Sequence, residues 1–319
     1  MDKFISVFDT SISSLNVGDS IIMDAVNREI DNVFGAYQHI RIPSHEKIGL
    51  TSLSIIRKSK TSIVGGSNIL ASYMNRYKQW MLSPLDAYFI KQKVILLGVG
   101  WRDYQGSTNF YTRALLKRIL DRGGLHSVRD SYTQQKLNDI GILNVVNTGC
   151  PTMWELTVEH CNQISTKKAA NVIFTLTDYN RSFDRDTKMI EVLKANYERL
   201  FFWVQGGKDR AYFATLGKIA EGITVIPPNL REYNNALESL NVDYIGTRLH
   251  AGIRALQKGK RTIIIGIDNR AEEKRKDFGL PVLDRTKIEE LDSLLNTAFK
   301  TTIRLPGENI SKWKAQFRP

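Results

Sequence analysis

An arginine and a histidine stand two positions apart where an expected strand passes into an expected helix. Residues 244–256 run from an apolar stretch through a glycine into a helical pattern, whose buried face is marked by Leu249, Ile253 and Leu256. Arg248 is expected in the first turn, where a cation opposes the helix dipole at a cost of up to about 1 kcal/mol unless an anion compensates. With the backbone N–H groups of that turn, its guanidinium could hold a phosphate or a carboxylate.

His250 places an acid or base beside this candidate anion site. An imidazole with an ordinary pKa near 6.5 can donate or accept a proton at neutral pH. The alternative is that Arg248 pairs with an acidic neighbour and that His250 is a core residue with satisfied hydrogen bonds. Arg254, one turn further on the same face, could extend the cationic surface or face solvent. Residues 247–276 hold nine Lys/Arg against three Asp/Glu, which suits an anionic ligand but also an ordinary solvated face.

The elements that must position these side chains alternate between short apolar runs and segments of helical period. Between the first two runs, Ile22, Val26, Ile30 and Val33 keep a helical spacing and are expected to form one buried helix face. We interpret the runs themselves as buried parallel strands. They cover residues 4–8, 62–64, 94–97, 127–128, 144–146, 171–176, 200–204, 223–226, 243–245 and 262–265. This alternation places the chain in the α/β class.

The length of 319 residues is enough for two α/β domains. We expect the first domain at residues 1–150 and the second at residues 168–300, joined by a hinge with a glycine, a proline and a polar run. Residues 301–319 are expected to form a C-terminal helix, with Trp313 on its apolar face, that could pack back across the domain boundary. If two open sheets face each other, the carboxyl ends of their strands surround one crevice, where ligands should bind.

The composition limits the choice of partner and location. The net charge of +12 predicts an anionic partner, which could be a nucleic acid, a lipid surface or a phosphorylated metabolite. The chain has no helix-turn-helix, zinc-finger or RNA-binding aromatic motif, so we predict no nucleic-acid partner. It also has no apolar window of roughly 18 residues and no basic segment followed by a long apolar stretch, so we expect a cytoplasmic protein.

No residue pattern indicates a metal or a dinucleotide cofactor. Cys150 and Cys161 match neither a disulfide framework nor a tetrahedral metal site, and we interpret them as structural. The remaining histidines show no metal-ligand spacing; they are His39, His45, His126 and His160. The Gly-x-Gly pair at residues 98–100 is followed by Trp101 instead of the further glycine that a dinucleotide fingerprint needs.

Five short motifs occur in the order typical of one protein family. They are the turn Asn16-Val17-Gly18-Asp19, the loop Gly65-Gly66-Ser67, the strand end Gly98-Val99-Gly100, the turn Val128-Arg129-Asp130-Ser131-Tyr132-Thr133 and the helix start Arg248-Leu249-His250. Over nearly the whole chain, the sequence therefore resembles the polysaccharide pyruvyl transferases. Two stretches depart from the family pattern. Asp268-Asn269-Arg270 stands where members often have an aromatic-Asp pair and a Lys, and Gly149-Cys150-Pro151-Thr152 replaces an Asp-Pro-Ala-like turn.

The resemblance implies a fold and a reaction. The fold would be two Rossmann-like domains facing a central cleft, as in B-type glycosyltransferases. The reaction would use phosphoenolpyruvate as co-substrate, with no further cofactor, to form a pyruvate ketal on a sugar of a bacterial exopolysaccharide, capsule or other cell-surface glycan. The acceptor could be a lipid-linked oligosaccharide, and the basic chain could touch the anionic inner face of the cytoplasmic membrane. The alternatives are a nucleotide-sugar glycosyltransferase on the same architecture and a basic scaffold without catalytic activity.

The resemblance also assigns roles to residues. The second domain would bind the donor and the first would face the acceptor. The predicted donor-binding residues are Thr247, Arg248, Leu249, Arg254 and Arg270, and the predicted acceptor-side residues are Asn16, Gly18, Gly65, Gly66, Ser67 and Arg129. His250 would protonate the methylene carbon of the donor or assist the departure of phosphate, and Asp19 would be either the base for the acceptor hydroxyl or a helix cap. The two adjacent glycines could instead only form a tight turn, and Arg129 could pair with Asp130 to brace its loop.

Overall fold

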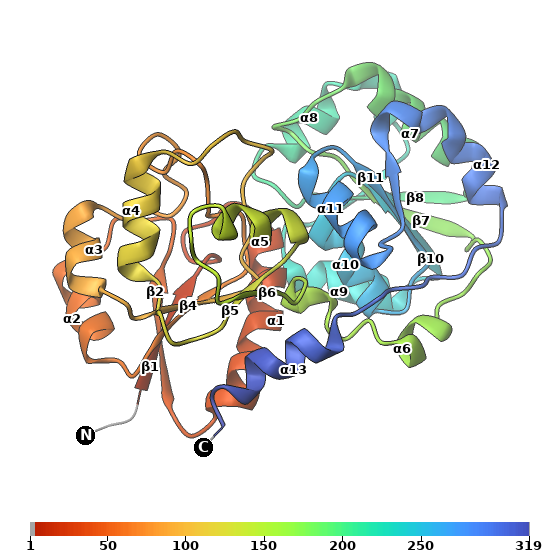
Figure 1. Cartoon of the computed structure of the whole chain (residues 1–319). Coiled ribbons are helices and arrows are strands. Elements are labelled where there is room, and N and C mark those ends of the chain that lie inside the picture. Colours follow the sequence, from red (N-terminus) through yellow and green to blue (C-terminus); the bar gives the residue numbers. More distant parts are fainter. Residues whose placement is uncertain (1–3, 319) are drawn as a thin grey trace. The chain divides into compact units, whose positions relative to one another are not determined.

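The structure is a computed structural model that describes residues 4–318 (Figure 1). The chain divides into two compact units, each with its own parallel sheet. The first unit contains the chain up to Ser14, Ile22–Pro151 and the chain from Leu305 onward, and the second contains Leu15–Ile21 and Thr152–Arg304. The predicted α/β class is confirmed, since every strand pair in the named sheets is parallel.

The first unit is built on a four-stranded sheet in the order β2-β1-β3-β4, with a separate pair β5-β6. Its strands are β1 (Phe4–Asp9), β2 (Gln38–Pro43), β3 (Ser62–Gly65), β4 (Val94–Leu97), β5 (His126–Val128) and β6 (Val145–Asn147). Its helices are α1 (Val17–Phe34), α2 (Leu50–Lys58), α3 (Pro84–Ile90), α4 (Phe110–Ile119), α5 (Ser131–Asn138) and α13 (Gly307–Ala315). In Figure 1, α2, α3 and α4 lie side by side on one face of the sheet, and α1 and α13 lie beyond its other face.

Continuous apolar sequence explains the central strands and one helix face of this unit. β1, β3 and β4 are buried almost throughout, as expected for strands covered on both faces. Ile22, Val26 and Ile30 of α1 are fully buried, as predicted, whereas Val33, the fourth residue of the predicted face, is only partly buried. The edge strand β2 was not predicted, because its sequence QHIRIP holds no continuous apolar run and buries only Ile42.

The C-terminal helix α13 belongs to the first unit. Trp313 is fully buried, and its indole Nε1 donates to the carbonyl oxygen of Leu96 at the end of β4 (3.1 Å). Phe317 packs against Phe34 at the end of α1, with ring centroids 4.7 Å apart. The chain therefore leaves the second unit after Arg304 and completes the core of the first.

The second unit is built on a six-stranded sheet in the order β12-β11-β10-β7-β8-β9. Its strands are β7 (Asn171–Thr175), β8 (Arg199–Trp203), β9 (Thr224–Ile226), β10 (Val242–Gly246), β11 (Thr262–Gly266) and β12 (Val282–Asp284). Its helices are α6 (Val158–Asn162), α7 (Phe183–Asn196), α8 (Asp209–Ala214), α9 (Leu230–Ser239), α10 (Leu249–Gln257), α11 (Asn269–Phe278) and α12 (Leu291–Asn296). The edge strand β12 was not predicted; it buries only Leu283 of its three residues.

The strand order of this unit bears on function. The strand order reverses at β7, which has β8 on one side and β10 on the other, so the carboxyl ends of β7 and β10 form a topological switch point. Ligands of open α/β sheets bind at such points.

Across residues 4–318, no helix is long and apolar enough to cross a membrane.

Candidate active site

The side chain of Arg248 lies at the switch point of the second sheet. Gly246 ends β10 and pairs in register with Thr175, the last residue of β7. Arg248 follows two residues later in the N-cap position of α10, with extended backbone angles (φ −90°, ψ 104°), and its side chain makes no capping hydrogen bond. The predicted position inside the first turn is therefore wrong by one residue. The side chain of the N-cap residue therefore leaves the first N–H groups of α10 to other partners.

Two carboxylates hold the guanidinium of Arg248. Its Nε donates to Oδ2 of Asp209 (3.0 Å) and to the carbonyl oxygen of Leu176 (3.2 Å). Its Nη2 donates to the second oxygen of Asp209 and to Oδ1 of Asp178 (2.9 Å). The alternative in which Arg248 pairs with acidic neighbours is thus the arrangement that the structure has, and the cation is compensated before any substrate binds.

Asp209 and Asp178 differ in burial. Asp209 begins α8, is fully buried and also accepts from the backbone N–H groups of Gly206 (2.6 Å) and Asp178 (3.1 Å). Burial raises the pKa of the Asp209 carboxyl, while the charge and hydrogen bonds of Arg248 act in the opposite direction. Asp178 follows β7, remains 18% exposed at its side chain and meets Arg248 through one nitrogen. Asp209 is therefore the fixed partner and Asp178 the accessible one.

Two glycines allow this close packing. A Cβ on Gly206 would collide with the guanidinium of Arg248, and a Cβ on Gly246 would stand 2.6 Å from the backbone nitrogen of Thr175. Tyr244 fixes the same corner from below, since its hydroxyl donates to the carbonyl oxygen of Arg248 (2.8 Å). The backbone that carries Arg248 is thus held by packing as well as by ion pairs.

The Asn-x-Gly-Asp turn lies with the second unit, next to the end of β8. Asn16 forms an isolated antiparallel bridge with Gly206, and its Oδ1 accepts from Nε2 of Gln205 (2.8 Å). The backbone nitrogen of Val17 donates to the carbonyl oxygen of Gln205 (3.0 Å). A Cβ on Gly18 would stand 2.6 Å from Nε2 of Gln205, so a larger residue here would displace the Gln205 side chain. We had expected these residues in the segment 1–150 on the acceptor side, whereas their contacts are with the unit that holds Arg248.

The start of α1 shows which residue of the turn acts as the cap. α1 begins at Val17, and the preceding Asn16 accepts at Oδ1 from the backbone nitrogen of Gly18 (3.1 Å). This is the N-cap geometry, in which a side-chain oxygen satisfies a first-turn N–H group. Asp19 stands in the first turn and is buried, 3.4 Å from the amide nitrogen of Asn16. The N-cap position therefore belongs to Asn16, and Asp19 stands three residues further on, in the first turn.

The other predicted donor residues of this stretch lie on α10 or just before it, with Arg254 in its last turn. His250 and Leu249 are both buried in its first turn. Thr247 pairs through its hydroxyl with Thr177 (2.8 Å), which ties the loops after β10 and β7 together. Arg254 is also buried, so the alternative that placed it in solvent is wrong.

Tyr179 joins Arg248 and Arg270, although the sequence reasoning did not single it out. Its ring centroid lies 5.1 Å from Cζ of Arg248 and 6.0 Å from Cζ of Arg270, and its hydroxyl accepts from Nη2 of Arg270. The side chain is 59% exposed. Nε of Arg270 also contacts both oxygens of Asp268, the N-cap of α11 (3.1 and 3.0 Å). An aromatic residue shortly after the predicted strand at residues 171–176 was the available sequence signal.

The predicted residues of the first unit have structural partners. Gly66 and Ser67 both have positive φ (60° and 64°), and a Cβ on Gly65 or Gly66 would collide with α1, at Val26 or Ile22 respectively. The two glycines therefore bring the end of β3 against the helix, in agreement with the tight-turn alternative. Ser67 is buried, and its carbonyl oxygen accepts from the backbone nitrogen of Gly100 (2.9 Å).

Arg129 and Asp130 form the bracing ion pair that the sequence left open. Nε of Arg129 donates to Oδ2 of Asp130 (3.0 Å), and its Nη2 donates to the carbonyl oxygen of Trp101 (3.0 Å). Asp130 also caps α5 by accepting from the backbone nitrogen of Thr133 (2.7 Å). Both charged side chains are buried, so the pair fixes the turn between β5 and α5.

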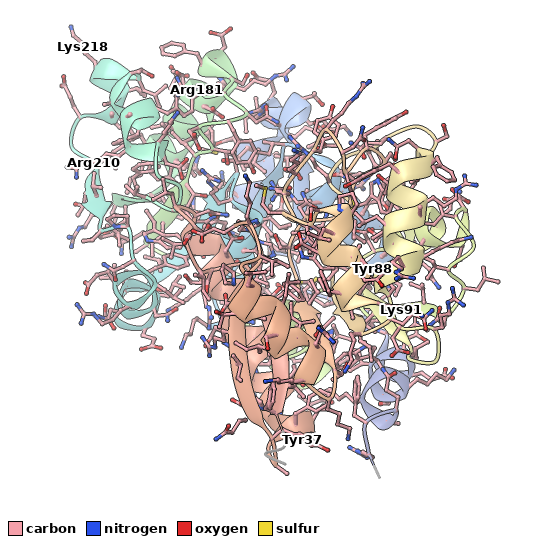
Figure 2. The ribbon with its side chains drawn as sticks, turned by 90° about the vertical axis from the view of Figure 1, so that its left-hand side faces the viewer. Tyr37, Tyr88, Lys91, Arg181, Arg210 and Lys218 are labelled. Carbon is pink, nitrogen blue, oxygen red and sulfur yellow. The ribbon has the colours of Figure 1, made fainter. Side chains whose placement is uncertain are left out.

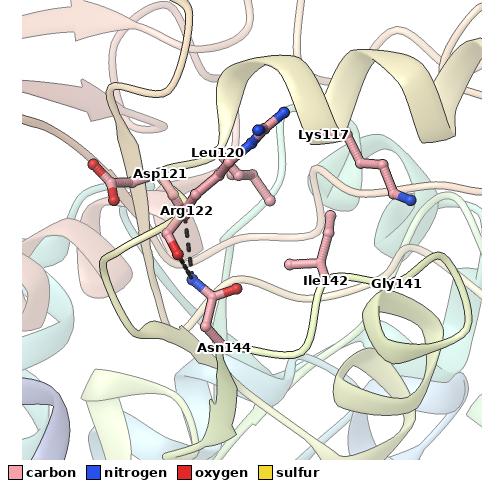
Figure 3. A pocket seen from close by; sticks show the side chains of 7 residues that line it. All are labelled: Lys117, Leu120, Asp121, Arg122, Gly141, Ile142 and Asn144. Atoms are coloured by element: carbon pink, nitrogen blue, oxygen red, sulfur yellow. Dashed lines mark hydrogen bonds between the residues drawn. The ribbon is translucent and has the colours of Figure 1, made fainter.

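One cavity of the first unit, of about 330 Å³, contains none of the predicted site residues (Figure 3). It is lined by Lys117, Leu120, Asp121, Arg122, Gly141, Ile142 and Asn144. The amide of Asn144 closes one side by donating to the carbonyl oxygens of Asp121 (3.2 Å) and Arg122 (3.4 Å), drawn as dashed lines in Figure 3. The predicted donor residues around Arg248 lie at the switch point of the second sheet and not at this cavity. We therefore assign the candidate site to the switch point.

Within the part of the chain that the structure describes, no three His, Cys, Asp or Glu residues are grouped as metal ligands.

Comparisons with known proteins agree with this picture. The model of the polysaccharide pyruvyl transferase family matches residues 16–269, which include both the Asn-x-Gly-Asp turn and the Arg-x-His helix start. Solved structures with a similar fold include the Methanocaldococcus jannaschii UDP-GlcNAc 2-epimerase in complex with UDP-GlcNAc and UDP (TM-score 0.57, 13% identity, covering 99% of this chain and 100% of that one). Another is the UDP-N-acetylglucosamine 2-epimerase from Rickettsia bellii (TM-score 0.53, 11% identity, 99% and 94% covered). No curated protein sequence gave a significant match.

Proposed function

Because the chain belongs to the polysaccharide pyruvyl transferase family, we propose that it transfers the enolpyruvyl unit of phosphoenolpyruvate to a sugar of a cell-surface glycan. The family expected from the motifs is confirmed, and it makes the protein an enzyme of polysaccharide pyruvylation. The identity of the donor and of the glycan is the proposed part. The observation that supports it most is the position of Arg248, which stands at the switch point at the start of α10 and makes one of its contacts to the accessible Asp178.

The chemistry asks for cations and for one proton donor. Protonation of the methylene carbon of phosphoenolpyruvate produces an oxocarbenium-like centre. One sugar hydroxyl adds to that centre and loses its proton, phosphate leaves, and a second hydroxyl adds to close the ketal and loses its proton. The donor carries a carboxylate and a phosphate, so its binding needs positive charge or oriented N–H groups, which are strongest away from bulk water.

We assign the anion-binding role to Arg248 and the first N–H groups of α10. Asp209 keeps the guanidinium in place with two hydrogen bonds, while the accessible Asp178 occupies the outer nitrogen Nη2. An incoming carboxylate or phosphate would compete with Asp178 for that nitrogen. Asp178 would thus act as a stand-in for the substrate anion, and Arg254 and Arg270 would add positive charge.

We assign the proton transfer to His250, which occupies the first turn of α10 directly after Arg248 and Leu249. The residue either protonates the methylene carbon or assists the departing phosphate. Asp19, in the first turn of α1, is the proposed base for an acceptor hydroxyl. Its packing within the same unit as Arg248 supports a role near the donor.

A donor titration tests this proposal. Isothermal titration of the purified protein with phosphoenolpyruvate is compared with titrations of uridine and guanosine sugar nucleotides. We expect saturable binding of phosphoenolpyruvate alone and release of phosphate when a suitable sugar is added. Binding of a sugar nucleotide without binding of phosphoenolpyruvate would instead favour a glycosyltransferase.

The acceptor and the location are further parts of the proposal. A bacterial exopolysaccharide or capsule repeat unit, either free or lipid-linked, fits the family. We place the reaction in the cytoplasm, where phosphoenolpyruvate is available. A screen of candidate sugars for phosphate release by the purified enzyme would identify the acceptor.

A further inference from the structure

The positive charge of the chain is concentrated in one segment of the first unit. Residues 47–122 contain 13 Lys/Arg and three Asp/Glu, a difference of +10 out of a net charge of +12 for the whole chain. A positive field of this size attracts anionic partners and is strongest at low ionic strength. The segment includes α2, α3 and α4, and its charge plays no part in the candidate site.

These three helices form one layer. α3 packs against both α2 and α4, and the layer covers one face of the four-stranded sheet (Figure 1). α2 joins β2 to β3, α3 joins β3 to β4, and α4 follows β4. All three helices therefore run antiparallel to the strands and begin near the carboxyl ends of those strands. Figure 2 looks onto the outer face of this layer, where Tyr88 and Lys91 lie near each other.

One row of this outer face is cationic. The helices end in exposed basic residues: Arg57 and Lys58 on α2, Lys91 after α3 and Lys117 on α4. Asp86 is the one acidic residue within the three helices, and it is buried, where it completes the capping box of α3 with Ser83. The outer face of the layer therefore presents cations without exposed carboxylates from the same helices.

Large apolar side chains share the face with these cations. Leu85 and Tyr88, one turn apart on α3, are each 64% exposed, and Arg118 lies over the ring of Tyr88 (5.3 Å from Cζ to the centroid). Leu50 and Phe110, the first residues of α2 and α4, are both 85% exposed. Apolar side chains therefore lie at the helix starts and cations lie at the helix ends. Tyr88 lies between the two groups on the same surface.

We propose that the outer face of α2, α3 and α4 docks the protein on an anionic phospholipid bilayer. The cations would meet lipid phosphates and carboxylates, and the apolar side chains would enter the interface between headgroups and acyl chains. A nucleic acid would use the cations but leaves no partner for exposed leucines, since it offers base faces to aromatic side chains. The proposal stands independently of the donor and the acceptor of the transfer reaction.

Vesicle sedimentation tests the charge part of this proposal. The full-length protein is mixed with vesicles of phosphatidylcholine alone or with added phosphatidylserine. We expect binding only to the anionic vesicles. Raising the sodium chloride concentration should weaken this binding but leave the part that the apolar side chains contribute. The double variant Lys58→Glu/Lys91→Glu should bind at least about tenfold more weakly, because each cation near an anionic surface strengthens binding roughly fivefold.

Matched controls separate a surface effect from net charge. The double variant Lys218→Glu/Arg231→Glu changes two exposed cations of the second unit, and its vesicle binding should stay within about twofold of the wild-type value. The variant Leu85→Ser/Tyr88→Ser should lose the binding that persists at high salt, whereas Val158→Ser/Phe183→Ser, in the second unit, should keep it. Circular dichroism verifies that every variant is folded.

Three results would overturn the proposal. Absence of binding to phosphatidylserine vesicles would remove it outright. Equal losses in the two charge variants would show that net charge, and not this face, attracts the lipid. Binding of a single-stranded oligonucleotide more tightly than anionic vesicles would make the face a nucleic-acid surface. None of these results bears on phosphoenolpyruvate titration, so the two proposals can fail separately.

Discussion

The guanidinium of Arg248 is joined to the buried carboxylate of Asp209 through two of its nitrogens, and the third contact of this fork goes to the more accessible Asp178. A fork–fork pair of this kind fixes the plane of the guanidinium as well as its charge. The site is therefore preorganised on one side and exchangeable on the other. This asymmetry predicts opposite effects for the two aspartates.

Replacing Asp178 with asparagine should strengthen binding of phosphoenolpyruvate by roughly 3- to 10-fold, because a competing negative charge is removed from Arg248. Replacing Asp209 with asparagine should instead lower turnover by about 10- to 100-fold and lower the melting temperature, since a buried charge loses its fixed partner. Donor titration, steady-state rates and thermal melting measure these effects. Weaker binding in Asp178→Asn would show that this carboxylate does not stand in for the donor.

Asn16 and Asp19 should separate stability from catalysis. Asn16→Ala removes the oxygen that accepts from the backbone nitrogen of Gly18 and from Gln205, so unfolding should become easier by about 1 to 2 kcal/mol. Asp19→Asn keeps the shape of the side chain but removes its charge, so melting should change little while turnover falls at least about tenfold. Urea unfolding and phosphate-release rates distinguish the two. Full turnover in Asp19→Asn would place the acceptor base elsewhere.

The elements that the sequence predicted are those whose burial is written in a short stretch. The strands at the centre of each sheet are continuous apolar runs, and the face of α1 follows from the spacing of Ile22, Val26 and Ile30. The edge strands β2 and β12 were missed, since each buries a single side chain, Ile42 and Leu283 respectively. A search for continuous apolar runs fails where a strand is only partly buried.

The partners of the site residues could not be predicted, because they come from distant parts of the chain. Arg248 meets Asp209 and Asp178, which follow different strands and lie 39 and 70 positions away. Asn16 meets Gln205 across 189 positions, so the turn after the first strand lies with the second unit. The motifs indicated candidate residues, while sheet order determines which of them meet.

His126 should make stability depend on pH. The side chain is fully buried, its Nε2 lies 2.9 Å from the carbonyl oxygen of Asp121, and its Nδ1 accepts from the backbone nitrogen of Leu96 (3.3 Å). This pairing fits a neutral ring, and burial lowers the pKa of His126 to about 4. At a pH between about 4 and the unfolded-state pKa near 6.5, the unfolded chain binds a proton at His126 that the folded chain does not.

The contribution of His126 is therefore complete above pH 6.5 and is lost as pH falls towards 4, by up to about 3 kcal/mol. Urea unfolding at several pH values measures it. His126→Gln lacks the titrating ring, so the difference between wild type and variant should shrink as pH falls. The NMR signal of the His126 imidazole can be assigned by its absence in His126→Gln. If that signal titrated near 6.5 in the folded protein, it would contradict this expectation.

Transfer should need no divalent metal, since Arg248 and the start of α10 are proposed to hold the anionic donor. We expect enzyme treated with a chelator to keep its rate of phosphate release within about twofold. Strict dependence on added magnesium or manganese would mean that a metal ion, and not these groups, neutralises the donor phosphate.

His250 and Arg248 should fail in different ways, because one is proposed to move a proton and the other to hold an anion. His250→Gln keeps polarity and much of the volume but has no acid near neutral pH, so donor affinity should survive while turnover falls by roughly 10² to 10⁴. Arg248→Lys keeps the charge but loses the fork that reaches Asp209 and Asp178 together, so it should weaken donor binding and also slow the reaction.

Donor titration and single-turnover rates on folded variants measure the two effects separately. Asp178→Asn, which leaves Arg248 its fixed partner, is the matched control for a change in local charge. Near-normal turnover in His250→Gln would reduce the histidine to a structural residue of α10. Unchanged donor affinity in Arg248→Lys would mean that the guanidinium serves only Asp209 and Asp178, and that the donor anion lies elsewhere.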